Sequence, residues 1–271
     1  MIQLKILRRI AFIGCTHLGS RFALWPRTVP ATVEADIELA GIRHTILDYF
    51  YDFVEKVRAA HCDSVILLGD LIEGQNSKEY GTGLITSKVS EQLDAFIEVA
   101  KPLCEGRKTG IIEGTSYHVQ LSGDPMEKHL CSQLNAEWLG FIVNKQMEPS
   151  KLVFNMAHGY GGGGTNVSTA IENEIKEMLI AEAQGSIPHI DVIVRGHLHS
   201  SDADVTMRGK RFIRVPCWKA FGDWKRMGHY YGRHQPIIGG KVVTVYDDYI
   251  DVASHIYPTP KLKAIDGSDK F

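Results

Sequence analysis

The sequence lacks several features that mark whole classes of protein. It has five cysteines, an odd number, and no Cys-x-x-Cys pair, so no disulfide framework is expected and the cysteine usage indicates a reducing compartment. No run of about 18 apolar residues occurs, and the short apolar stretch near the N-terminus is typical of a first β-strand. These absences predict a cytoplasmic protein that does not span a membrane.

Net charge is also small. The formal value of −2 argues against a broadly basic nucleic-acid scaffold but leaves room for a local basic cleft. Hydrophobic residues make up 44% and charged residues 23%, which is typical of a soluble globular chain. Since neither an internal repeat nor a clear linker is visible, we expect a single domain over residues 1–258, followed by a polar C-terminal tail over 259–271.

Short apolar strands alternate with amphipathic helices along the first 200 residues. Strands are predicted at 6–13, 64–68, 109–112, 152–156 and 191–194, and helices at 42–60, 87–103, 125–134 and 166–183. Three more strands are predicted at 212–215, 241–246 and 249–256. This order predicts a layered α/β core with a sheet-rich C-terminal part.

Residues that can bind metals follow five of the predicted strands. The segments are Gly14-Cys15-Thr16-His17, Gly69-Asp70-Leu71-Ile72-Glu73-Gly74, Gly114-Thr115-Ser116-Tyr117-His118, His158-Gly159 and Gly196-His197-Leu198-His199. Ligands of α/β proteins collect at the carboxyl ends of strands, so these segments are expected to converge. Two divalent ions need several imidazoles and a carboxylate that bridges them. Asp70 is the natural bridge because it follows a buried strand directly.

The ordered set resembles the calcineurin-like metallophosphoesterases, whose pattern runs Asp-x-His, Gly-Asp, Gly-Asn-His, His and Gly-His-x-His. The match covers roughly residues 8–200. Residues 20–26, 161–166 and 215–222 are similar to a bacteriophage and prophage branch, which would place the protein in the host cytoplasm. The resemblance implies a four-layer α/β/β/α sandwich of two mixed β-sheets flanked by helices, with two divalent metal ions.

By position in the family pattern, the resemblance assigns the ligands of the two ions. One ion would take Cys15, His17, Asp70 and His199, and the other would take Asp70, Thr115, His158 and His197. Cys15 stands where the family has aspartate. A thiolate binds zinc or iron well and manganese poorly, so zinc or iron is favoured over manganese. Alternatively, Cys15 is a small buried residue and one ion is lost.

The second departure from the family pattern lies after the third strand. Thr115 replaces an asparagine ligand, and its hydroxyl is the poorer donor to a metal. The histidine that usually follows is displaced to His118, which is expected to act either as general acid or as a ligand. Arg21, Arg27 or Arg195 could hold phosphate oxygens, although a solvated surface role is the common alternative for each.

The expected function is a metal-dependent phosphoesterase that hydrolyses phosphodiester bonds, in nucleic acid or a nucleotide, by attack of a metal-activated water. His118 would protonate the leaving oxygen. One alternative is a phosphomonoesterase that acts on nucleotides or phosphoprotein. The other is a catalytically weak protein of the same fold that binds a nucleic acid or a protein. The sequence leaves the oligomeric state open.

Two further segments have more than one interpretation. Residues 218–226, from Trp218 to Arg226, interleave aromatic and basic side chains, which suits stacking on bases or a loop anchored in the core. The run Gly161–Gly164 before a helix could cradle a phosphate. It lacks the lysine of a P-loop, so a flexible loop beside His158 is preferred.

Overall fold

The computed structural model describes residues 5–27, 37–76, 81, 83–121, 124–159, 167–220 and 235–260. The glycine run at 161–164, residues 221–226 of the aromatic and basic segment, and residues 261–271 of the predicted tail lie outside them. Thr259 begins that tail, and its hydroxyl donates to the carbonyl of Pro236 at 2.6 Å, so the first tail residue is tied to the body of the protein.

One sheet has six strands in the order β13-β12-β1-β2-β3-β6. Their bounds are Arg8–Ile13 for β1, Ser64–Leu67 for β2, Lys108–Ile112 for β3, Ala136–Gly140 for β6, Ile238–Val245 for β12 and Ile250–Tyr257 for β13. β1, β2, β3 and β6 run parallel, whereas β12 pairs antiparallel with both β1 and β13. The sheet is therefore mixed.

The other sheet has five strands in the order β10-β11-β9-β8-β7. Their bounds are Ile142–Gln146 for β7, Val153–Ala157 for β8, Val192–Arg195 for β9, Ala203–Met207 for β10 and Lys210–Arg214 for β11. The three inner strands are parallel, and β7 and β10 are antiparallel edges. A separate short pair joins β4 (Gln120–Leu121) to β5 (Asp124–Pro125).

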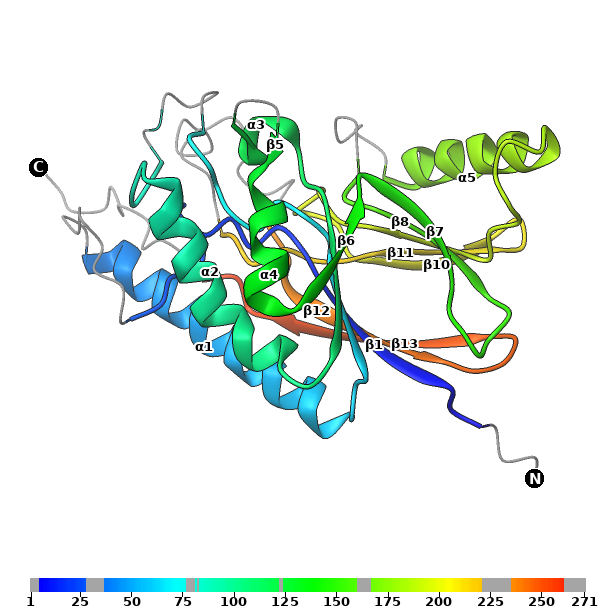
Figure 1. The fold of residues 1–271 in the computed structure, drawn as a ribbon, viewed down its shortest axis with the longest axis horizontal. Coiled ribbons are helices and arrows are strands. Elements are labelled where there is room, and N and C mark those ends of the chain that lie inside the picture. Colours follow the sequence, from blue (N-terminus) through cyan, green and yellow to red (C-terminus); the bar gives the residue numbers. More distant parts are fainter. Residues whose placement is uncertain are drawn as a thin grey trace, which may run out of the picture.

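Helices cover the outer face of each sheet. The helices are α1 (Ile37–Ala59), α2 (Val89–Cys104), α3 (Ser116–Val119), α4 (Leu130–Leu134), which follows the 3-10 helix Met126–His129, and α5 (Val167–Ala183). α1 and α2 lie beside the six-stranded sheet, and α5 lies on the far side of the five-stranded sheet (Figure 1). The predicted α/β/β/α sandwich is confirmed. Within the described residues, no helix is long and apolar enough to cross a membrane.

Alternation along the strands explains the layers, because successive side chains point to opposite faces. In β1, Ile10 and Phe12 enter the core between the sheets, whereas Ala11 and Ile13 enter the core under α1 and α2. Ile193 of β9 points instead to the core under α5. Because the inner strands are buried on both faces, they read as continuous apolar runs in the sequence.

The sequence prediction missed β6, β7 and β10, whose side chains are largely half-buried or exposed. These edge strands carry polar residues and give no continuous apolar run. The predicted helix at 125–134 is divided into the 3-10 helix and α4. Phe141 alone separates β6 from β7, so the chain passes directly from one sheet to the other.

Candidate metal centre

The five strand-end segments meet where the carboxyl ends of β1, β2 and β3 face those of β8 and β9. Ligand atoms of their side chains form three groups, within each of which all atoms lie within 4.8 Å of one another. The groups are Cys15, His17 and His199; His17, Asp70 and His118; and Asp70, His158 and His197. Since His17 and Asp70 each belong to two groups, the three form one connected cluster.

Backbone strain is concentrated in this cluster. Cys15, His17, Asp70 and His197 have φ values of 53°, 48°, 49° and 65°, the left-handed region that side chains with a Cβ rarely adopt. Such strain persists only where the surrounding structure fixes it, and it gathers at functional sites.

The loops after β2 and β3 touch directly. A Cβ on Gly114 would lie 2.3 Å from the backbone nitrogen of Asp70, and one on Gly69 would lie 2.6 Å from Gly114. Glycine is therefore required at both positions. The close approach brings Thr115 to the carboxylate of Asp70.

Asp70 is buried at the middle of the cluster. Its Oδ1 accepts hydrogen bonds from the backbone nitrogen and the hydroxyl of Thr115, at 2.6 and 2.8 Å. Its Oδ2 lies 3.0 Å from Nε2 of His158 and 3.9 Å from Nε2 of His17. Burial alone would raise the pKa of Asp70, but the imidazoles of His158, His118 and His17 hold it well below its ordinary value. The carboxylate is ionised and reaches both sides of the cluster.

Two histidine rings are oriented by carbonyl oxygens, which can only accept a hydrogen bond, and a third lies beside a carboxylate. Nδ1 of His158 lies 2.6 Å from the carbonyl of Leu68, and Nδ1 of His118 lies 2.8 Å from the carbonyl of Glu73. Nδ1 of His17 lies 2.8 Å from the carboxylate of Glu73. Nδ1 of His158 and of His118 must therefore carry a proton, so Nε2 of these rings has the lone pair when the ring is neutral. This arrangement is typical of metal-binding histidines.

The cluster brings ring nitrogens of four histidines close together. Nε2 of His17 lies 3.1 Å from Nε2 of His199, and Nε2 of His158 lies 3.1 Å from Nδ1 of His197 as well as close to Asp70. The donor and acceptor roles of these nitrogens depend on the tautomer of each ring, and a divalent cation between two of them would take a lone pair from each. The donor set of imidazoles, carboxylate and thiol also suits zinc or iron. The residues therefore fit a metal centre.

Protonation favours the same interpretation. Burial and the nearby Lys219 lower the pKa of His17 to about 4, and burial together with His158 lowers the pKa of His197 to about 4. The pKa of His199 lies well below its ordinary value because of burial and His17. These rings are neutral at pH 7, which is the form that binds a metal. Burial would lower the pKa of His158, but Asp70, the carbonyl of Leu68 and Glu127 together raise it.

Cys15 lies where the resemblance expects a ligand. Its sulfur is buried near His17 and His199, and it accepts a hydrogen bond from the backbone nitrogen of His197 at 3.2 Å. Burial and the charge of Asp70 raise the pKa of the thiol well above its ordinary value. The thiol is therefore protonated in the metal-free chain, and a cation that binds here must displace that proton.

The other predicted residues have distinct environments. Thr115 donates both its backbone N–H and its hydroxyl to Asp70, so it holds the bridge, and we do not keep it as a ligand. Arg21 is half-buried and donates to the carbonyl of Leu84, and Arg27 is exposed and pairs with Asp48.

Arg195 requires a correction. Its side chain is buried, and its guanidinium donates to the side chain and carbonyl of Asn155, the carbonyl of Val194 and the carboxylate of Glu174. Neither a phosphate contact nor the solvated surface role fits this environment. The residue stabilises the second sheet, because its donors join neighbouring strands to α5.

The aromatic and basic segment begins in the core. The ring of Trp218 is buried against Phe50, with centroids 4.9 Å apart, so it is not available to stack on a base. Lys219 follows, and its ammonium lies 2.8 and 2.9 Å from the two carboxylate oxygens of Glu73. For these first residues, the core-anchored interpretation is the correct one.

Sequence reasoning missed three supporting residues, Glu73, Lys219 and Glu127. The carboxylate of Glu73 is buried among His17, Lys219 and Asn76, and although burial would raise its pKa, Lys219 and His17 lower it to about 2. Glu127 accepts from the backbone nitrogens of Leu71 and Gly114, at 2.6 and 2.9 Å, which joins the loops after β2 and β3. Glu73 stood in a strand-end segment and Lys219 in the aromatic and basic segment, whereas no local signal indicates Glu127.

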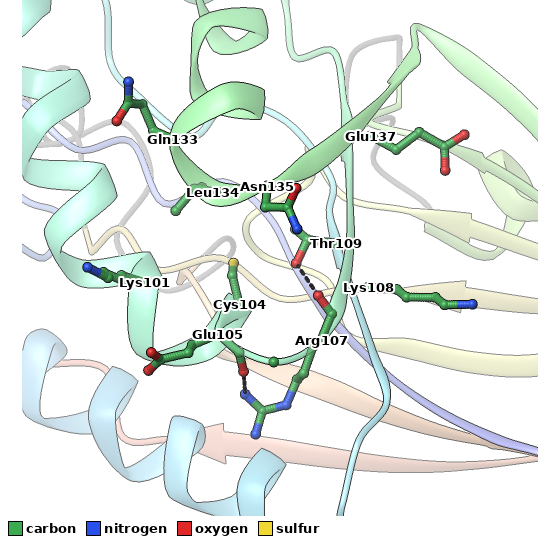
Figure 2. A pocket seen from close by; sticks show the side chains of 11 residues that line it. Lys101, Cys104, Glu105, Arg107, Lys108, Thr109, Gln133, Leu134, Asn135 and Glu137 are labelled. Atoms are coloured by element: carbon green, nitrogen blue, oxygen red, sulfur yellow. Dashed lines mark hydrogen bonds between the residues drawn. The ribbon is translucent and has the colours of Figure 1, made fainter.

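A hollow of about 640 Å³ lies at the opposite end of the first sheet, beside the amino ends of β3 and β6 (Figure 2). Lys101, Glu105, Lys108 and Glu137 give it charges of both signs. Arg107 also lines it, but its guanidinium donates to the carbonyl of Leu103 at 2.8 Å and so closes the end of α2. The hollow is separate from the metal cluster.

Comparisons with known proteins find only distant likenesses. No family model matches the sequence, and no curated protein matches it. Among solved structures, a single mutant of Vps29 from Entamoeba histolytica aligns at TM-score 0.43 and 10% identity over 92% of this chain and 99% of that one. Vps29 from Chaetomium thermophilum aligns at TM-score 0.43 and 13% identity over 95% and 100%. Vacuolar protein sorting 29 from Cryptosporidium parvum aligns at TM-score 0.41 and 12% identity over 93% and 99%.

These likenesses assign no function. The similarity of three sequence segments to a phage and prophage branch stays a prediction, as do the host location, the domain boundary at 258 and the oligomeric state.

Proposed function

We propose that this chain is a metal-dependent phosphoesterase with a centre for two divalent ions. The observation that carries the proposal is the position of Asp70. Its carboxylate lies between the pair formed by His17 and His199 and the pair formed by His158 and His197, with Nε2 of His158 and of His17 at 3.0 and 3.9 Å from its Oδ2. A carboxylate that joins two imidazole pairs is the arrangement that two neighbouring cations require.

The ligands divide between the two ions by proximity. Cys15, His17 and His199 would hold one ion, and His158 and His197 would hold the other. Asp70, which is grouped with the second set and lies 3.9 Å from Nε2 of His17, would bridge the two. Bound ions supply a water of lowered pKa for attack on phosphorus and neutralise charge on the phosphate oxygens. The thiol favours zinc or iron at the first position.

His118 is the proposed general acid. Its Nδ1 is engaged by the carbonyl of Glu73, so Nε2 is the atom that would carry a proton to the leaving oxygen. The ring of His118 lies edge-on to that of His17 at 4.7 Å between centroids, which keeps it beside the cluster. Ligation of an ion by the same nitrogen is the alternative role.

The proposed substrate is a phosphodiester, in nucleic acid or a nucleotide. This preference comes from the family that the sequence resembles, and it is separable from the metal site. Bis-p-nitrophenyl phosphate, p-nitrophenyl phosphate, single-stranded DNA and cyclic nucleotides, each with manganese, zinc, nickel or iron, test it directly. We expect turnover of diesters that chelation abolishes and that exceeds turnover of the monoester.

The test variant is Asp70→Asn. Its matched control is Asp94→Asn, because Asp94 is an exposed carboxylate on α2. Turnover that is lost in the first variant and kept in the second supports the proposal. No turnover with any of the metals, or equal turnover in Asp70→Asn, would overturn it. Fewer than one bound ion per chain, not rescued by Cys15→Asp, would favour the catalytically weak binding protein. The protonated, hydrogen-bonded thiol of Cys15 is the observation that keeps this alternative in view.

A further inference from the structure

Arg214, the last residue of β11, has a buried side chain that is only 4% exposed. Its Nε and Nη1 atoms are buried and have no hydrogen-bond partner among the described residues. Phe212 lies two residues earlier on the same face, which faces α5, and the guanidinium carbon lies 5.2 Å from the centre of its ring. A planar cation is thus held in place while two of its donor atoms are unused.

Arg195, the neighbouring cation, donates to acceptors that lie close to Arg214. Arg195 stands beside Arg214 in the register between β9 and β11. Arg195 donates to Asn155 and to the carboxylate of Glu174, and Glu174 is the acid whose charge also acts on Arg214. Glu174 pairs directly with Arg195, whereas only its charge, and no hydrogen bond from Nε or Nη1, reaches Arg214.

The position of Arg214 connects it to the metal cluster. After Arg195, the chain continues through Gly196 to His197, one of the proposed ligands. The pKa of His197 is lowered by burial and His158, and the charge of Arg214 contributes to the same lowering. The unused donors thus lie near the loop that carries His197 and His199.

Burying a guanidinium without an anion is costly, and a fork of unused N–H groups matches the oxygens of a phosphate. We propose that Arg214 anchors an anion subsite next to the metal centre, where it takes a phosphate group of the substrate. The identity of the anion rests on the proposed function. The existence of the subsite rests on the burial and unused donors of Arg214.

Binding of inorganic phosphate to the full chain without added metal tests the subsite. Titration calorimetry and thermal unfolding would be measured for wild type, Arg214→Met, Arg214→Lys and the control Arg208→Met, in which an exposed arginine of the β10–β11 turn is removed. We expect phosphate to stabilise wild type and the control. In Arg214→Met, Kd should rise at least about 10-fold, as loss of a charge-assisted hydrogen bond implies. Arg214→Lys keeps the charge without the forked guanidinium, so its Kd for phosphate should lie between those of wild type and Arg214→Met.

The unfolding temperature without phosphate separates an anchor from a structural residue. Because Arg214→Met removes an unpaired buried charge, its unfolding temperature should equal or exceed that of wild type. A marked fall with phosphate affinity unchanged in both Arg214 variants would overturn the proposal, and so would failure of phosphate to bind wild type. None of these readouts involves turnover, so an Arg214-dependent phosphate site in a chain that hydrolyses nothing would leave the subsite standing and the proposed function overturned.

Discussion

The ammonium of Lys219 lies 2.8 Å from the carboxylate of Glu73, although 146 positions separate the two residues in the chain. The same carboxylate lies 2.8 Å from Nδ1 of His17, so Lys219, Glu73 and His17, a proposed metal ligand, form a buried chain of charged and polar contacts. Carboxylates that orient the outer nitrogen of a metal-binding histidine tune both its orientation and its basicity.

Glu73→Gln should weaken metal binding. Loss of an outer carboxylate costs about 10–100-fold in metal affinity or activity, and the unpaired Lys219 should lower the free energy of unfolding by roughly 3–5 kcal/mol. Zinc titration and denaturant unfolding would measure the two effects, with Glu55→Gln on the exposed face of α1 as control. The double variant Glu73→Gln, Lys219→Met should recover stability but not zinc affinity. Zinc affinity unchanged in the single variant would contradict the role of Glu73 in supporting His17 as a metal ligand.

Cys15→Asp should change metal preference. An aspartate supplies oxygen ligands that suit manganese, whereas the thiolate suits zinc. We expect turnover with manganese to rise, and the affinity for zinc to fall, relative to wild type. Metal analysis and turnover with each ion would be compared with Cys131→Ser, a half-buried cysteine outside the cluster. If Cys15→Asp and wild type share one metal profile, Cys15 does not bind an ion.

His118→Asn should distinguish a general acid from a ligand. Loss of a general acid lowers turnover by about 10²–10⁴-fold for a poor leaving group, and by much less for p-nitrophenolate, which leaves without a proton. Loss of a ligand lowers both rates together and reduces bound metal. The paired measurement is kcat on an alkyl and a p-nitrophenyl diester, with metal content determined for the same samples.

The metal-free chain should lose stability as pH falls from about 6.5 towards 4. His17 and His197 have pKa values lowered from 6.5 to about 4, so the unfolded chain binds more protons in this window. Their stabilisation is fully present above pH 6.5 and is lost as pH falls through 4, at roughly 1.4 kcal/mol per pH unit for each proton. Burial raises the pKa of Glu127 to about 8, which offsets the loss by about one proton above pH 4.5 and leaves a net loss from the two histidines. Chemical unfolding in the presence of chelator would measure the slope, which His197→Gln should reduce. A flat profile in wild type would refute the prediction.

The sequence predicted the layers of the fold because its inner strands are buried on both faces. Strands such as β1 and β2 read as apolar runs that end at a glycine, and this placed Cys15, His17 and Asp70 at strand ends. The edge strands β6, β7 and β10 gave no such signal. These strands form because they pair with a neighbouring strand of the sheet, and their half-exposed residues carry no apolar pattern that marks a strand.

The site was predictable where ligands lie next to strand ends and unpredictable where partners come from distant parts of the chain. Asp70 and the pair His197 and His199 could be predicted from the apolar strand that directly precedes each of them. Lys219 and Glu127 are placed by tertiary packing, and no spacing in the sequence links them to His17 or Asp70. Arg195 was misplaced because the sequence does not reveal that Asn155 and Glu174 surround it.

The passage from β6 to β7 through Phe141 has a mechanical consequence. It ties the two sheets at the carboxyl end of the seam between them, the same end at which His17 and Asp70 from one sheet face His158 and His197 from the other. A cation bound there would join the two sheets reversibly, at the same end at which the chain joins them permanently through Phe141. Loss of the cation would loosen β1, β2, β8 and β9 together, and the amides of all four strands would exchange with solvent as one unit.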